Sequence, residues 1–192
     1  MSCRSIIRGF TLIELMVTLA IAAVLMMVAA PGLTAFKRNA ELTSVANTLL
    51  SSINAARGEA MKRSMRTLVV PQDGANWSNG WIVFVDQNRS NSYDAGSDIT
   101  VQIQPALQSY FTVTGDTGTA ANSPPYIMFD PSGFAALIGS SSFGNLTMTI
   151  TRNDLSGSVQ TAETRRLIVA VTGRARTCNP STDSGCTTSA TD

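Results

Sequence analysis

Gly9-Phe10-Thr11-Leu12-Ile13-Glu14 stands at the head of an apolar run that continues to Ala30. A run of about 20 apolar residues is long enough for one helical crossing of a bilayer. The carboxylate of Glu14 interrupts this run near its start. Because a charge inside an apolar helix is costly, such residues are functional candidates. The stretch therefore predicts a membrane helix with Glu14 as its first functional residue.

A short basic leader, residues 1–9, precedes the run and ends in Gly9. Basic residues favour the cytoplasmic side of a membrane, so the bulk of the chain is expected outside the cytoplasm. A secretory signal peptide is the alternative interpretation, with Val28-Ala29-Ala30 as its cleavage site. The length of the apolar run and the proline at position 31 argue against it.

The stretch from Gly9 to Glu14 matches the prepilin motif without departure and resembles the type IV pilins and the pseudopilins of type II secretion. The resemblance implies that a prepilin peptidase cuts after Gly9 and methylates the new amine of Phe10. It also implies that Glu14 faces the positive N-terminus of a neighbouring subunit in the filament core. A carboxylate is favoured near a helix N-terminus, and a buried charge needs a partner. An ordinary membrane anchor with Glu14 near the interface is the alternative.

Composition limits the classes of function that remain. The chain has 192 residues, a formal net charge of +1 and no histidine. Its length beyond the helix suffices for one core. The lack of histidine excludes Ser-His-Asp machinery and His-ligated metals. We therefore expect no catalytic residue, no metal and no cofactor, and a membrane-anchored enzyme is the least favoured class.

A second helical pattern occupies residues 35–66. Its apolar positions recur at steps of three and four, as one stripe of a helix. These positions are Leu42, Ala46, Leu49, Ile53, Ala56 and Ala60. We expect one nearly continuous helix from Phe10 to about Met65. Residues 10–34 form its membrane and filament-core half, and residues 35–66 form an amphipathic half that packs on a sheet.

Short strand-like segments follow, over residues 67–177. The segments predicted as strands are 67–70, 81–85, 99–103, 111–113, 126–129, 146–150 and, as the last strand, 166–171. The turn Asp130-Pro131-Ser132-Gly133 should join 126–129 to 134–138 as a hairpin. Residues 156–161 are expected to form a loop. Strands without intervening helices indicate antiparallel sheets, so the fold class is α+β: a long N-terminal helix packed on small antiparallel sheets.

Two of the three cysteines lie close together near the C-terminus. Cys3 lies in the leader, whereas Cys178 and Cys186 lie in a polar tail, residues 178–192. Outside the cytoplasm this pair is expected to form a disulfide that closes a small loop and pins the tail.

Three later segments indicate which branch of this family the chain resembles. Gly80 to Asp86, Phe129 to Gly133 and Val171 to Arg176 are similar to segments of the FimT-like minor pilins and pseudopilin-H. The similarity implies a type IV pilin-like fold and a low-abundance subunit that starts or caps a filament. The implied partners are other pilins or pseudopilins, the prepilin peptidase and the inner-membrane assembly platform. The implied location is the bacterial inner membrane, single-pass with a cytoplasmic N-terminus, and after assembly the periplasm or a cell-surface pilus.

The segment Gly173-Arg174-Ala175-Arg176 resembles the G-R-x-R motif with which FimT-like pilins bind double-stranded DNA in natural transformation. Gly173 lets the chain turn out of a sheet, and arginines at i and i+2 of an extended segment point the same way. Each arginine can chelate a phosphate. Arg165 and Arg166 would extend this patch if they are close in space. The alternatives are solvated arginines, arginines that bridge to a neighbouring subunit, and a purely structural pseudopilin without DNA binding.

Two further features have weaker patterns. Residues 86–94 carry oxygen ligands at alternate positions, but Asn91 and Ser97 replace the glycine and glutamate of a calcium loop, which favours an Asx-rich hairpin loop. Trp77 and Trp81 are either stacking platforms for a sugar or base, or residues of the core.

Overall fold

The computed structural model describes residues 9–189, apart from the side chains of residues 28–31. Cys3 and the rest of the predicted leader before Gly9 lie outside the described residues. The chain divides into two compact units between Ala40 and Glu41, and each unit is described by itself.

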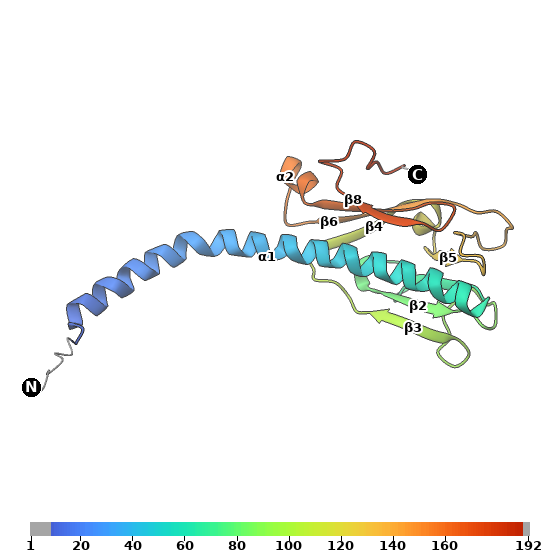
Figure 1. The fold of residues 1–192 in the computed structure, drawn as a ribbon, viewed down its shortest axis with the longest axis horizontal. Coiled ribbons are helices and arrows are strands. Elements are labelled where there is room, and N and C mark those ends of the chain that lie inside the picture. Colours follow the sequence, from blue (N-terminus) through green and yellow to red (C-terminus); the bar gives the residue numbers. More distant parts are fainter. Residues whose placement is uncertain (1–8, 190–192) are drawn as a thin grey trace, which may run out of the picture. The chain divides into compact units, whose positions relative to one another are not determined.

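Helix α1 runs from Leu12 to Arg63 (Figure 1), which confirms the long helix expected over residues 10–65. In the first unit, every large apolar side chain from Leu12 to Met27 is at least 50% exposed. Exposed apolar surface of this extent marks a segment that is covered by a membrane or by other proteins. By length and hydropathy, no single described helix qualifies as a membrane span, whereas Leu12–Met27 and Gly32–Arg63 qualify together as a bent pair.

The second half of α1 forms the centre of the head. All six positions of the predicted apolar stripe are at most 2% exposed: Leu42, Ala46, Leu49, Ile53, Ala56 and Ala60. They share one core cluster with side chains from two sheets. The spacing of three and four residues therefore identified the buried face of the helix correctly.

The first sheet contains four antiparallel strands in the order β3-β2-β1-β5. Its strands are β1 Thr67–Pro71, β2 Trp81–Val85, β3 Ile99–Gln104 and β5 Ile127–Phe129. Val69 lies opposite Val83 and Ile127, and all three belong to the core shared with α1. Leu68 and Phe84 belong to a smaller apolar cluster on the other face, as the alternation of a strand requires.

The second sheet also contains four antiparallel strands, in the order β4-β6-β7-β8. Its strands are β4 Phe111–Thr117, β6 Leu146–Arg152, β7 Thr164–Val169 and β8 Ala175–Cys178. Three short helices lie between the strands: η1 Trp77–Asn79, η2 Gly118–Ala121 and α2 Gly157–Ala162. The two sheets and α1 give the predicted α+β architecture (Figure 1).

Two local expectations were wrong, and a third is confirmed only in part. β7 ends at Val169, and the strand β8 follows it, so 166–171 is not the last strand. Helix α2 replaces the loop expected over 156–161, because the Gln160 amide donates to the Arg152 carbonyl and anchors it to β6. Residues 134–138 form only isolated bridges. The predicted turn is present, because the Gly133 N–H donates to the Asp130 carbonyl and the Ala136 N–H donates to the Met128 carbonyl, but the segment after it forms no strand.

Candidate functional site

The N-terminal site begins with a helix cap. The Glu14 N–H donates to the Thr11 hydroxyl at 3.3 Å, so Thr11 caps α1 and Glu14 occupies its third helical position. The helix dipole favours a carboxylate there. Glu14 is exposed, and within residues 9–189 its side chain has no hydrogen bond or ion pair. Phe10, the predicted mature N-terminus, is 75% exposed.

Gly173 marks the first contact of the C-terminal motif. It has φ +78°, and a Cβ atom there would lie 1.9 Å from the Gly133 carbonyl oxygen. Only glycine fits such an approach, and glycine also adopts the positive φ without strain. The turn after β7 is therefore packed directly on the Asp130–Gly133 turn, and the glycine of the motif has a structural role.

Arg57 of α1 fastens both of these turns to the helix. Its Nε donates to the Gly133 carbonyl at 2.9 Å, and its Nη2 donates to the Thr172 carbonyl at 3.0 Å. In the sequence, Arg57 directly follows Ala56 of the apolar stripe and belongs to no motif. Its partners are 76 and 115 residues away, so no local pattern could have identified it.

The four candidate arginines have different environments. Arg174 is exposed, and within the described chain its side chain has no hydrogen bond or ion pair. Arg176 pairs with Asp183 at 3.4 Å and is 26% exposed. Arg166 donates from Nε to the Thr149 hydroxyl at 3.3 Å and from Nη1 to a carbonyl of the tail, that of Cys186.

Arg165 points away from this group. Its Nη1 donates to the carbonyls of Ala162 and Thr164, at 3.3 and 2.9 Å. Neighbouring residues of a strand alternate between faces, so Arg165 and Arg166 occupy opposite faces of β7. The structure thus brings Arg166 and Arg176 together, and it sends Arg165 towards α2.

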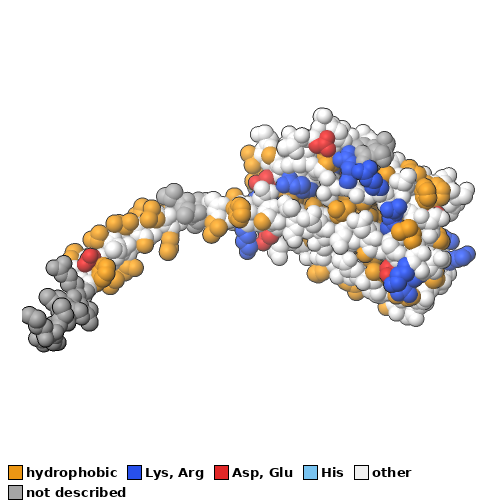
Figure 2. Space-filling view, in the orientation of Figure 1, with side chains coloured by type: hydrophobic (Ala, Val, Ile, Leu, Met, Phe, Trp, Pro, Cys, Tyr) orange, Lys and Arg blue, Asp and Glu red, His pale blue; other side chains and the backbone are white. Residues whose placement is uncertain are grey.

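The tail lies against Arg166 and Arg176. Cys178 and Cys186 form the expected disulfide, with Cα atoms 5.8 Å apart. The loop that it closes carries Asp183, the partner of Arg176. Figure 2 shows basic side chains gathered beside the C-terminal end of the chain. Two of the candidate DNA-binding arginines are therefore already engaged by the tail.

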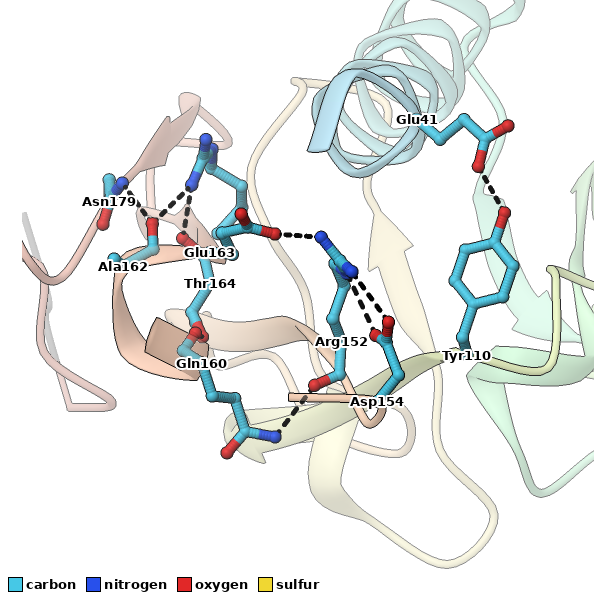
Figure 3. Close-up of polar contacts among 10 residues, drawn as sticks. Glu41, Tyr110, Arg152, Asp154, Gln160, Ala162, Glu163, Thr164 and Asn179 are labelled. Carbon is cyan, nitrogen blue, oxygen red and sulfur yellow. Dashed lines mark hydrogen bonds and ion pairs between the residues drawn. The ribbon is translucent and has the colours of Figure 1, made fainter. Parts of the chain in front are cut away.

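A buried ionic cluster anchors α2 (Figure 3). The Arg152 side chain is 3% exposed, forms two hydrogen bonds with Asp154 at 3.0 and 2.7 Å, and also pairs with Glu163. The hydrogen bond to Asp154 raises the pKa of Arg152 although burial opposes it. Since both carboxylates are satisfied by one guanidinium, this cluster is structural.

The loop after β2 is closed by its own acidic residues. The Asp86 carboxylate accepts the N–H groups of Ser90 and Asn91, and the Asp98 carboxylate accepts those of Gln87 and Asp94. These are the contacts of an Asx-rich loop.

The two tryptophans belong to the core. The Trp81 Nε1 donates to the Ser52 hydroxyl at 2.9 Å, and the Trp77 Nε1 donates to the Ala120 carbonyl at 3.1 Å. Both residues are at most 2% exposed, so neither is a stacking platform.

Comparison with known proteins agrees with this geometry. The sequence profile of the family described as type II transport protein GspH matches residues 45–173, and that of the prokaryotic N-terminal methylation motif matches residues 4–30. The chain is 30% identical over 171 residues to the pilin-like protein PilA1 of Thermus thermophilus, covering 88% of this chain and 97% of that protein.

Solved structures show the same fold. The type IV minor pilin FimU of Pseudomonas aeruginosa, in one crystal form, matches with a TM-score of 0.54 and 19% identity, over 76% of this chain and 94% of that one. A second crystal form of FimU also gives a TM-score of 0.54, with 17% identity, over 72% and 94% of the two chains.

Proposed function

Because the chain belongs to the GspH family and carries the N-terminal methylation motif, we propose that it acts as a minor subunit in the tip or initiation complex of a type IV pilus. Pilins and pseudopilins of this kind are structural proteins. The observation that supports the proposal is the exposed apolar helix, whose carboxylate, that of Glu14, has no partner within the described residues of its own chain.

The proposed mechanism is assembly rather than catalysis. The prepilin peptidase cuts after Gly9 and methylates the amine of Phe10. Residues 10–34 remain in the inner membrane until the assembly platform extracts the subunit. An unpaired carboxylate is costly in the apolar core of a filament, so Glu14 binds the Phe10 amine of a neighbouring subunit.

Substitution of Glu14 tests this mechanism. Glu14→Ala should be processed normally, with the Phe10 methylation detected by mass spectrometry. It should be depleted from sheared filaments by more than tenfold, since breaking a buried ion pair costs about 3–5 kcal/mol. Glu14→Asp, which keeps the charge, is the control and should assemble better than Glu14→Ala. Normal incorporation of Glu14→Ala would contradict the pairing.

DNA capture is the second candidate function, and the exposed, unpartnered guanidinium of Arg174 within the described chain supports it. A contact between Arg176 and DNA requires release of Asp183. In a salt titration of duplex DNA binding by the full-length protein, Arg174→Gln should lower the slope of log K against log salt by about 0.9 for one lost phosphate contact. Sequence preference should not change. An unchanged slope would exclude Arg174 from the interface.

A structural pseudopilin of type II secretion is the alternative, and the description of the matched family favours it. Deletion of the gene separates the two machines. The pilus proposal expects loss of surface pili with intact protein secretion. Loss of secretion with intact pili would assign the subunit to the pseudopilus.

A further inference from the structure

A small cavity lies at the C-terminal end of α1, beside the loop that follows β2. Its volume is about 230 Å³. The residues that line it are Ser64, Met65, Arg66, Asp86, Arg89 and Pro131. Figure 2 shows basic side chains gathered over this end of the helix.

Within the described residues, no carboxylate neutralises the positive charge of either arginine in the cavity. Arg66 donates from Nη1 to the Asn91 side-chain oxygen at 3.2 Å, and Arg89 is exposed. Among residues 9–189, neither guanidinium has a carboxylate within 4.0 Å. The acidic residue of the lining, Asp86, is 1% exposed, and its two oxygens accept the N–H groups of Ser90 and Asn91. The cavity therefore presents excess positive charge.

The loop that carries Arg89 is held in an unusual conformation. Arg89 and Asn91 have φ +59° and +61°, in the left-handed region that residues other than glycine rarely adopt. Such conformations persist only where surrounding contacts impose them, and they cluster at ligand clamps. Here the Asp86 carboxylate supplies those contacts. Asp86 is thus a positioning residue for Arg89.

The turn that lines the cavity also touches the residue that precedes the candidate DNA-binding residue Arg174. Pro131 lines the cavity, and Gly133 of the same turn touches Gly173, the residue before Arg174. Arg66 and Arg89 therefore share the cavity with Pro131 of this turn, and Arg174 follows the residue that touches Gly133 of the same turn. A single anion could occupy only the cavity, whereas a chain of phosphates can reach both places.

We propose that Arg66 and Arg89 bind one phosphate of a polynucleotide strand whose neighbouring phosphates contact Arg174. The inference rests on the proposed DNA binding and extends it to a site that the G-R-A-R segment does not include. The planar fork of an arginine matches a phosphate in two parallel hydrogen bonds. Double-stranded DNA supplies one charge per about 1.7 Å of its axis, so one duplex is long enough to contact the cavity at Pro131 and the residue that follows Gly173.

The test is a salt titration of the full-length protein in neutral detergent, with a fluorescent DNA duplex of arbitrary sequence. Arg66→Gln and Arg89→Gln should each lower the slope of log K against log salt by about 0.9. Arg89→Lys should keep most of the slope. Arg165→Gln removes the same charge elsewhere on the head and should leave the slope unchanged. Thermal melting checks that each variant folds, and Arg89→Gln in its exposed loop suffices if Arg66→Gln does not fold.

Two results would overturn the inference. Wild-type affinity and slope for Arg89→Gln, with a lowered slope for Arg174→Gln, would exclude the cavity and leave the proposed DNA function standing. Failure of the wild-type protein to bind the duplex would reject both. If the wild-type protein does not bind the duplex and Arg89→Gln is lost from filaments, the cavity binds a carboxylate of another pilin instead.

Discussion

At the scale of single residues, geometry separates structural from functional roles. The glycine of the Gly173–Arg176 segment is required by the approach of the Gly133 carbonyl, whatever the segment binds. Arg174 has no such internal role in the described chain. The segment appears to be one motif in the sequence, but its residues have different roles: Gly173 packs against another turn, and Arg174 presents an exposed charge.

Gly173→Ala should destabilise the head more than a change at another left-handed glycine. The new Cβ meets the carbonyl of Gly133 and also forces a positive φ, so we expect a loss of about 2–4 kcal/mol in the free energy of unfolding. Gly139→Ala is the matched control, since Gly139 has φ +73° and nothing within 4 Å of its Cβ position. It should cost about 1–2 kcal/mol. Equal losses, measured by denaturant unfolding, would argue against the close approach.

Asp73 gives a pH-dependent prediction. The N–H groups of Asn76 and Ala75, with the side chain of Asn79, lower its pKa to about 2 from a normal value of 3.8. A lowered pKa stabilises the fold above pH 3.8, and this contribution is lost as pH falls towards 2. Asp73→Asn should therefore lower Tm at pH 7, with a difference that shrinks between about pH 4 and pH 2.

Asp116 is the control with the opposite sign. Burial raises its pKa, so its charge costs stability as pH rises above 3.8. The Tm of wild type relative to Asp116→Asn should therefore fall as pH rises. If the Tm difference between wild type and variant changed with pH in the same direction for Asp73→Asn and Asp116→Asn, the opposite pKa shifts of the two residues would be contradicted.

At the scale of elements, local periodicity decided what could be predicted. The helix stripe from Leu42 to Ala60 was correct because a helix repeats every few residues. Helix α2 and strand β8 were missed because they are only six and four residues long and are held by bonds to residues outside their own stretch. The Gln160 amide binds Arg152, and β8 pairs with β7 only after the tight turn at Gly173. The candidate site followed the same rule: the arginines were visible in the sequence, whereas the contacts of Arg176 with Asp183 and of Arg166 with the Cys186 carbonyl were not.

Arg57 is predicted to be a structural link between elements. Arg57→Leu keeps much of the apolar volume and leaves the carbonyls of Gly133 and Thr172 without their donor. Leaving such groups unsatisfied costs about 1–3 kcal/mol each, so a clear loss in the free energy of unfolding is expected. Asn54→Ala, an exposed change on the same helix, should have little effect. An unchanged free energy of unfolding in Arg57→Leu would show that the two turns keep their conformation without Arg57.

The disulfide is predicted to hold the tail more than the core. Replacing Cys178 and Cys186 with serine should cost about 2 kcal/mol, as expected for a short closed loop. It should also speed hydrogen exchange of residues 179–189 while the amides of β6 stay protected. Unchanged exchange in the tail would mean that Arg166 and Arg176 suffice to hold it.

At the scale of the whole molecule, the two units suit different surroundings. The head has a closed core between α1 and two sheets. The large apolar side chains from Leu12 to Met27 remain at least 50% exposed and need cover from a membrane or from other subunits. We propose that a chain built in this way functions as an assembled subunit, and N-terminal processing is the step of this proposal that can be measured most directly.

Mass spectrometry of the N-terminal peptide, from protein purified with native filaments, tests this account most directly. We predict a chain that begins at Phe10 with a methylated amine. An unmodified N-terminus at Met1, or a chain trimmed after Ala30, would contradict it.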